Sequence, residues 1–154
     1  MQMTMRAVAT GLFLATLSVA QAQDGMLTVT DGRTTVEFDK DKLAAMEQDV
    51  IETSTVWTEG TGTFAGPSFQ AVLQEAGLAG ETVLAEALDG YSVEIPRGRL
   101  TGDGAILATT MNGEPLPEDK APYWIIFPYD QSPEINDTDH QDWSVWAVSK
   151  LTVQ

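Results

Sequence analysis

Apolar and polar residues alternate in short runs through most of the chain, a pattern typical of β-strands. Strands are predicted at residues 26–30, 33–38, 50–57, 82–87, 91–95, 105–111, 123–127 and 143–153. A two-residue hairpin turn at Asp31-Gly32 is expected to join the first two, because glycine reaches positive φ at no steric cost. Turns are also predicted at Asp89-Gly90 and Asn112-Gly113. The strongly apolar run at 123–127 predicts a central strand.

Helical spacing of apolar residues is clearest in the middle of the chain. One helix face is predicted from the residues at i, i+3, i+4 and i+7, namely Phe69, Val72, Leu73 and Ala76. Pro67 is expected to open this helix and Gly77 to end it. A second short helix is predicted over 42–46, with Asp39 or Asp41 as its N-cap. Two short helices on mixed, mostly antiparallel strands predict an α+β fold.

Two further segments interrupt this pattern. Residues 60–66, which contain three glycines, predict a flexible loop. Residues 7–20 form an apolar run that ends in Ala20-Gln21-Ala22, a small-x-small pattern, and so predict a cleaved signal peptide at residues 1–22. The run is shorter than the roughly 20 residues that span a bilayer. We therefore expect a single periplasmic domain at residues 23–154, with no membrane insertion after cleavage.

Charge and cysteine content narrow the classes of function. The chain has 8 Lys and Arg residues against 23 Asp and Glu residues, a formal net charge of −15. Such a field repels phosphate backbones and anionic lipid heads, so nucleic acids and membrane surfaces are not expected as partners. Cationic ligands, cationic partners and divalent metals remain open. With no cysteine, the chain has no thiolate for catalysis or for a metal site.

From Phe64 to the C-terminus, several motifs occur in order. Residues 64–77 read FAGPSFQAVLQEAG, residues 89–96 read DGYSVEIP, and residues 105–117 read AILATTMNGEPLP. Ala121-Pro122 follows, with an apolar strand ending in Pro128, and Trp146 precedes a final strand. Together they resemble the molybdopterin-binding domain of the sulfite oxidase family. The resemblance implies a mixed α+β fold in which a pterin holds one molybdenum atom, and activity on sulfite or on S- and N-oxides.

The departures from that family concern the residues that hold the cofactor. The family binds molybdenum through a cysteine thiolate, and this chain has no cysteine. Trp124 and Val145 stand where the family has an Arg and a Lys, and Lys120 is the nearest match to a family His. Tyr91 matches the tyrosine of the family's substrate pocket. By resemblance, the candidate cofactor-binding residues are Tyr91, Asn112 and Lys120, with no catalytic or metal-ligating residue assigned.

Three hypotheses follow from this combination. The first is a non-catalytic module that binds a small molecule or a periplasmic protein and has no cofactor, because a buried pyrophosphate without donors is strongly disfavoured. The second is a molybdopterin-dependent oxidoreductase, or a subunit of one, with the metal held by other ligands. The third is an acidic protein that binds divalent cations.

Other candidate residues have structural alternatives. The four tryptophans could form an aromatic wall for a ligand, or they could be large residues of the core. They are Trp57, Trp124, Trp143 and Trp146. The acidic segment 130–142, which includes Asp137, Asp139 and His140, could hold a divalent metal or form a solvated loop. A His-based catalytic triad could use only His140, the single histidine, and no nucleophile is marked for it. Arg97 and Arg99, in a turn after Pro96, could hold an anion or form local salt bridges.

Overall fold

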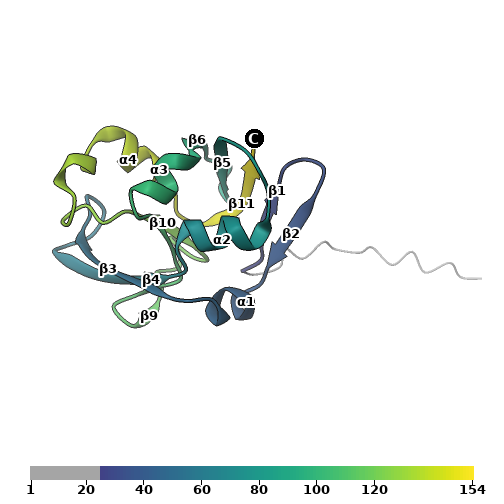
Figure 1. The fold of residues 1–154 in the computed structure, drawn as a ribbon. Coiled ribbons are helices and arrows are strands. Elements are labelled where there is room, and N and C mark those ends of the chain that lie inside the picture. Colours follow the sequence, from purple (N-terminus) through teal and green to yellow (C-terminus); the bar gives the residue numbers. More distant parts are fainter. Residues whose placement is uncertain (1–24) are drawn as a thin grey trace, which may run out of the picture.

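A computed structural model describes residues 25–154, so the predicted signal peptide at residues 1–22 lies outside the described residues. The largest sheet has the strand order β2-β1-β11-β5-β6 (Figure 1). Its strands are β1 (Leu27–Thr30), β2 (Thr35–Phe38), β5 (Thr82–Ala87), β6 (Ser92–Pro96) and β11 (Val148–Val153). β1 and β11 pair in parallel, and the other neighbours pair antiparallel. The predicted α+β class with a mixed, mostly antiparallel arrangement is confirmed.

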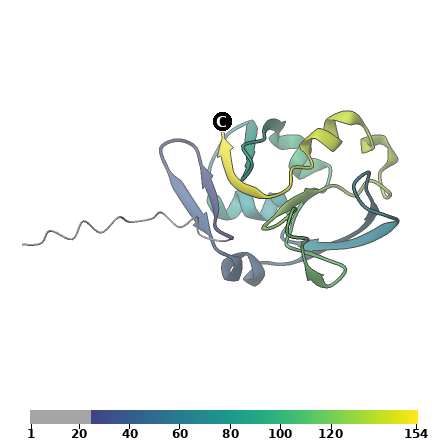
Figure 2. The same ribbon diagram turned by 180° about the vertical axis from the view of Figure 1, so that it is seen from behind.

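Two smaller sheets lie beside the large one (Figure 2). One has the order β3-β4-β8-β9, with β3 (Asp49–Ser54), β4 (Thr61–Gly66), β8 (Thr110–Met111) and β9 (Glu114–Pro115). The other pairs β7 (Ile106–Ala108) with β10 (Trp124–Ile126). Backbone hydrogen bonds from Leu107 to Pro67 and from Thr109 to Ala65 connect these two sheets.

Four short α-helices and one 3₁₀-helix complete the described part of the chain. They are α1 (Lys40–Ala45), α2 (Phe69–Ala76), α3 (Arg97–Gly102), the 3₁₀-helix (Pro133–Ile135) and α4 (Thr138–Trp143). Asp39, Ser68 and Asp137 cap α1, α2 and α4 by accepting a backbone N–H. Within residues 25–154, no helix has the length and apolar character needed to cross a membrane.

The apolar side chains form two clusters. The larger contains the predicted inner face of α2, with Phe69, Val72 and Leu73 packed among buried residues of β1, β5 and β11. The smaller surrounds Trp124, whose side chain is fully buried with Phe64 and Ile126. The candidate site described below lies beside this smaller cluster.

Residues 60–66 are not a flexible loop as predicted, because Thr61–Gly66 forms β4 between β3 and β8. The glycines in this segment make close packing possible. A Cβ added at Gly66 would lie 1.9 Å from the carbonyl oxygen of Leu107, and one at Gly62 would lie 3.1 Å from the Phe64 ring. The sequence pattern was misread because glycine serves close approach in a strand as well as flexibility in a loop.

Several strand predictions need correction. The segment 105–111 is divided between β7 and β8, which belong to different sheets. The apolar run 123–127 is buried but pairs only with β7, so it is not the centre of a large sheet. The segment 143–153 begins as a strand only at Val148, because Trp143 ends α4.

Turn and helix boundaries also differ from the prediction. The Asp31 N–H donates to the Thr34 carbonyl, which places the first hairpin turn at Gly32-Arg33 instead of Asp31-Gly32. Pro67 precedes the cap Ser68 and does not open α2, whereas Gly77 ends that helix in the left-handed conformation as predicted. The structure selects Asp39 over Asp41 as the cap of α1.

Candidate functional site

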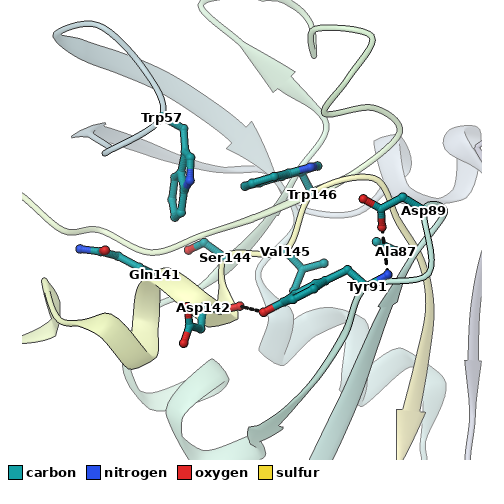
Figure 3. A pocket seen from close by; sticks show the side chains of 9 residues that line it. All are labelled: Trp57, Ala87, Asp89, Tyr91, Gln141, Asp142, Ser144, Val145 and Trp146. Carbon is teal, nitrogen blue, oxygen red and sulfur yellow. Dashed lines mark hydrogen bonds between the residues drawn. The ribbon is translucent and has the colours of Figure 1, made fainter.

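A pocket of about 270 Å³ lies where three connecting segments meet (Figure 3). The segments are the β3–β4 connection, the β5–β6 turn and the link from α4 to β11. We call it the Tyr91 pocket, and its lining residues are Trp57, Ala87, Asp89, Tyr91, Gln141, Asp142, Ser144, Val145 and Trp146. The rings of Trp57, Trp146 and Tyr91 surround the opening in Figure 3. The pocket therefore has three aromatic side chains and two carboxylates among its lining residues.

Tyr91 is positioned by the turn that joins β5 to β6. Gly90 has φ +91°, which L-residues rarely adopt, and the Asp89 carboxylate accepts the Tyr91 N–H at 3.0 Å. The Tyr91 hydroxyl reaches across to donate to the Asp142 carbonyl at 3.2 Å (Figure 3). Partial burial, together with the negative charge of Asp142, raises the pKa of Tyr91, so its hydroxyl stays protonated at neutral pH. The side chain thus forms a neutral hydroxyl-bearing wall.

Trp146 is held by a strained backbone position. Ala147, the next residue, has φ +51°, in the left-handed region that costs a non-glycine residue about 1–2 kcal/mol. Two hydrogen bonds hold it there: Ala147 donates to the Lys120 carbonyl at 3.0 Å, and Leu88 donates to the Ala147 carbonyl at 2.9 Å. The bond from Leu88 ties the α4–β11 link to the β5–β6 turn, so the walls that carry Trp146 and Tyr91 are connected through Ala147.

The four tryptophans divide between the two predicted roles. Trp124 is fully buried and makes edge contacts with Trp57 and Trp146, at centroid distances of 6.0 and 6.3 Å. Trp57 and Trp146 are half-buried, 5.7 Å apart and inclined by 72°, and both line the Tyr91 pocket. Trp143 lies elsewhere, 4.8 Å from His140. The core therefore supports an aromatic wall on its outer side.

A second pocket, of about 380 Å³, is lined by Asn112 and Lys120, and Trp57 is common to both pockets. Lys120 Nζ lies 3.6 Å from the centroid of the Trp146 ring and 3.2 Å from Asp119 Oδ2. Asn112 stands at φ +55° in the β8–β9 turn and accepts the Thr63 N–H at 2.9 Å. Both residues thus make contacts within the fold.

The three predicted cofactor-binding residues are therefore not gathered in one cavity. Asn112 and Lys120 share the second pocket, and Tyr91 lines the first. Asp89, Gln141 and Ser144 were missed as lining residues. The predicted Asp89-Gly90 turn placed Asp89 next to Tyr91 in the sequence. Gln141 lies in α4 and Ser144 follows it, and because no helix was predicted there, the sequence contained no reason to expect these two residues in the pocket.

The acidic segment 130–142 is not a loop as a whole, because it contains the 3₁₀-helix and α4. His140 is fully buried, with Nδ1 2.7 Å from Asp137 Oδ1 and Nε2 2.9 Å from Asp103 Oδ2. Asp130 accepts the N–H and the hydroxyl of Ser54, which lowers its pKa. Among residues 25–154 there is no group of three or more His, Asp or Glu side chains placed to hold a metal ion.

The two arginines considered as an anion site lie in α3, a helix where the sequence predicted a turn. Arg97 donates to the carbonyls of Leu78 and Gly80, at 2.7 and 3.4 Å. Arg99 forms a salt bridge with Asp103 at 2.9 Å. Arg99 therefore forms a local salt bridge, as the alternative predicted, whereas Arg97 is engaged by backbone carbonyls and not by an acidic side chain.

Comparison with known proteins gives one family. A family model described as "oxidoreductase molybdopterin binding domain" matches residues 15–128. The match starts well before Phe64, where the recognised motifs begin, and ends before Trp146. No curated protein matches the chain. Because the matched range covers well over half of the chain, the protein belongs to the oxidoreductase molybdopterin-binding domain family.

Proposed function

We propose that this member of the oxidoreductase molybdopterin-binding domain family is a non-catalytic binding module of the periplasm, which holds a small molecule or a partner protein and no molybdopterin. The observation that carries the proposal is the chemistry of the Tyr91 pocket. Its lining contains two carboxylates and no Lys, Arg, His or Cys.

Molybdopterin needs groups that neither pocket supplies. In the family, its metal is bound by a cysteine thiolate, and this chain has no cysteine. Its phosphate needs cationic or N–H donors, which are strongest when charged. Lys120 is the only basic side chain lining either pocket, and it is already paired with Asp119. The residues present therefore do not fit the cofactor.

The Tyr91 hydroxyl does not offer a base for neutral-pH chemistry, because its raised pKa keeps it protonated. Ser144 is an equally poor nucleophile, because its side chain is buried and bonded to the Tyr129 hydroxyl at 2.6 Å and to the His140 carbonyl at 3.0 Å. The His140 ring nitrogens contact carboxylates of Asp137 and Asp103, away from both pockets. These contacts support a binding role over a hydrolytic one.

The test is elemental analysis for molybdenum and tungsten, with pterin fluorescence after oxidation. The full chain would be exported with its own N-terminus from a host that makes the cofactor. A family member that carries the cysteine, exported in parallel, is the control for cofactor supply. We expect neither metal nor pterin. About one metal and one pterin per chain would overturn the proposal and favour an oxidoreductase, or a subunit of one, that holds the metal by other ligands.

A further inference from the structure

We infer that the Tyr91 pocket binds a small organic cation, of the alkylated ammonium class, between the rings of Trp57, Trp146 and Tyr91. This inference rests on the proposed binding function and names the ligand class for the same site. Three observations carry it: the aromatic walls, the sign of the charge around them, and the presence of a cation already bound to one of the rings.

The aromatic walls have the geometry that a cation needs. Trp57 and Trp146 stand at 72° with centroids 5.7 Å apart, and Tyr91 completes the opening (Figure 3). Rings set at an angle can present more than one electron-rich face to the space they enclose, and indole is the best of the aromatic side chains for this contact. The three rings come from different segments: the Leu88–Ala147 bond and the bond from Tyr91 to Asp142 connect the segments of Trp146 and Tyr91, and Trp57 packs edge-on against Trp124 and Trp146. The pocket is therefore preformed, which reduces the entropy lost on binding.

The charged side chains that line the pocket are both acidic. Among residues 25–154, Asp89 and Asp142 are the only charged residues that line it, and both are exposed. The Asp89 carboxylate accepts one backbone N–H, from Tyr91, and keeps further acceptor capacity. An anion would meet two like charges here, whereas a cation would gain from both. With a formal net charge of −15, the whole chain also attracts cations.

Lys120 provides the third observation. Its ammonium lies 3.6 Å from the centroid of Trp146 and is only 15% exposed. It lines the neighbouring pocket and not the Tyr91 pocket, so it does not fill the proposed site. The chain thus uses the Trp146 ring as a cation-binding surface, and the same ring also lines the Tyr91 pocket.

An alkylated ammonium fits this lining better than a metal ion does. Its methyl groups can be buried against three rings, while the charge is diffuse enough to need no direct ligand. A metal ion would require several oxygen ligands at short distances. The volume of about 270 Å³ lies just under the usual range of about 300–1,000 Å³ for drug-sized ligands, which points to a small molecule.

Choline and its neutral isostere 3,3-dimethylbutan-1-ol are the probes, measured by isothermal titration calorimetry and by tryptophan fluorescence on the full domain. We expect choline to bind and the isostere to bind at least about tenfold more weakly, because only the charge differs. Equal affinity for both would overturn the inference and leave an apolar pocket. No binding of choline to folded protein at high millimolar concentration would also overturn it.

Matched variants locate the site. Asp142→Asn and Tyr91→Leu are each expected to weaken choline binding by about fivefold, whereas Tyr91→Phe keeps the ring, loses only the bond to the Asp142 carbonyl, and is expected to weaken binding less than Tyr91→Leu. Glu118→Gln removes the same charge outside the Tyr91 pocket and is the control for Asp142→Asn. Unchanged affinity in both test variants, with thermal unfolding like that of the parent, would overturn the assignment to this pocket. Absence of choline binding together with absence of molybdenum would overturn this inference alone, whereas bound molybdenum would overturn the proposed function.

Discussion

Replacing Gly66 with alanine tests the closest approach between the smaller sheets. The new Cβ would lie 1.9 Å from the Leu107 carbonyl oxygen, 2.7 Å from the Leu107 carbonyl carbon and 2.9 Å from the Ala108 Cα. All three contacts are with backbone atoms, so no side-chain rotation can relieve them. β4 and β7 would have to separate, although the bonds from Leu107 to Pro67 and from Thr109 to Ala65 hold them together.

Overpacking a core by a methylene group costs about 1–3 kcal/mol, and a clash with fixed backbone belongs at the upper end of this range. We therefore expect Gly66→Ala to lower the free energy of unfolding by about 3 kcal/mol or more, which lowers the Tm by roughly 12 °C in a domain of this size. Circular dichroism during thermal and urea unfolding measures both quantities.

Gly98→Ala is the matched control, since it makes the same chemical change. An added Cβ at Gly98 meets nothing within 4 Å, and this exposed residue lies in α3. Alanine is a better helix former than glycine, so this variant is expected to gain about 0.5 kcal/mol. If Gly66→Ala unfolded within 2 °C of the parent, by about 0.5 kcal/mol or less, the described contact between β4 and β7 would be wrong.

Three further predictions concern buried or capped polar groups. His140→Leu should lower the free energy of unfolding by about 2 kcal/mol in urea denaturation through loss of the bond to Asp103, and a change below about 0.5 kcal/mol would contradict this role. Burial raises the pKa of Tyr123 and Tyr129 to about 12, above the ordinary 10.0. The stability that the folded state gains from keeping these phenols neutral is therefore complete below pH 10 and is lost as the pH rises toward 12. Absorbance at 295 nm should show both phenols ionising near pH 12, and ionisation of both near pH 10 in folded protein would refute it. Because the Ser54 hydroxyl and N–H lower the pKa of Asp130 below 3.8, its stabilisation is present at neutral pH and is lost as the pH falls below about 4. The Tm difference between Asp130→Asn and the parent should shrink from pH 7 to pH 2.5, and a constant difference would count against it.

Local patterns identified the elements whose apolar period is regular. The inner face of α2, the end of that helix at Gly77, and the strand Thr82–Ala87 are as predicted. Alternation over 82–87 and spacing over 69–76 each reflect one element with one buried face, which is the condition under which periodicity can be read directly.

The elements that were missed depend on contacts distant in sequence. α4 has few apolar residues, and its buried side chain is a histidine held by carboxylates of Asp103 and Asp137. β7 and β8 form one apolar run in the sequence and divide because one pairs with β10 and the other with β4. Neither outcome is encoded in a local period, because pairing partners and polar networks are chosen by the tertiary structure.

The candidate site was predictable only in its aromatic part. Tyr91 and the tryptophans were singled out from the sequence, and the structure brings Tyr91, Trp57 and Trp146 together. Their separation from Asn112 and Lys120 could not be foreseen, because the resemblance orders motifs along the chain and gives no distances between them. The strained Ala147 that orients Trp146 carries no sequence signal at all, since alanine is rarely used at positive φ.

The parallel pairing of β1 with β11 has a consequence for the order in which the molecule can assemble. β11 lies between the β1–β2 and β5–β6 hairpins, so until it has left the ribosome the large sheet exists at most as two separate ribbons. Isolated two-stranded ribbons are marginal in water. The large sheet therefore cannot form until β11 joins it, and a chain shortened before Val148 would leave the inner edges of β1 and β5 unpaired and open to edge-to-edge aggregation.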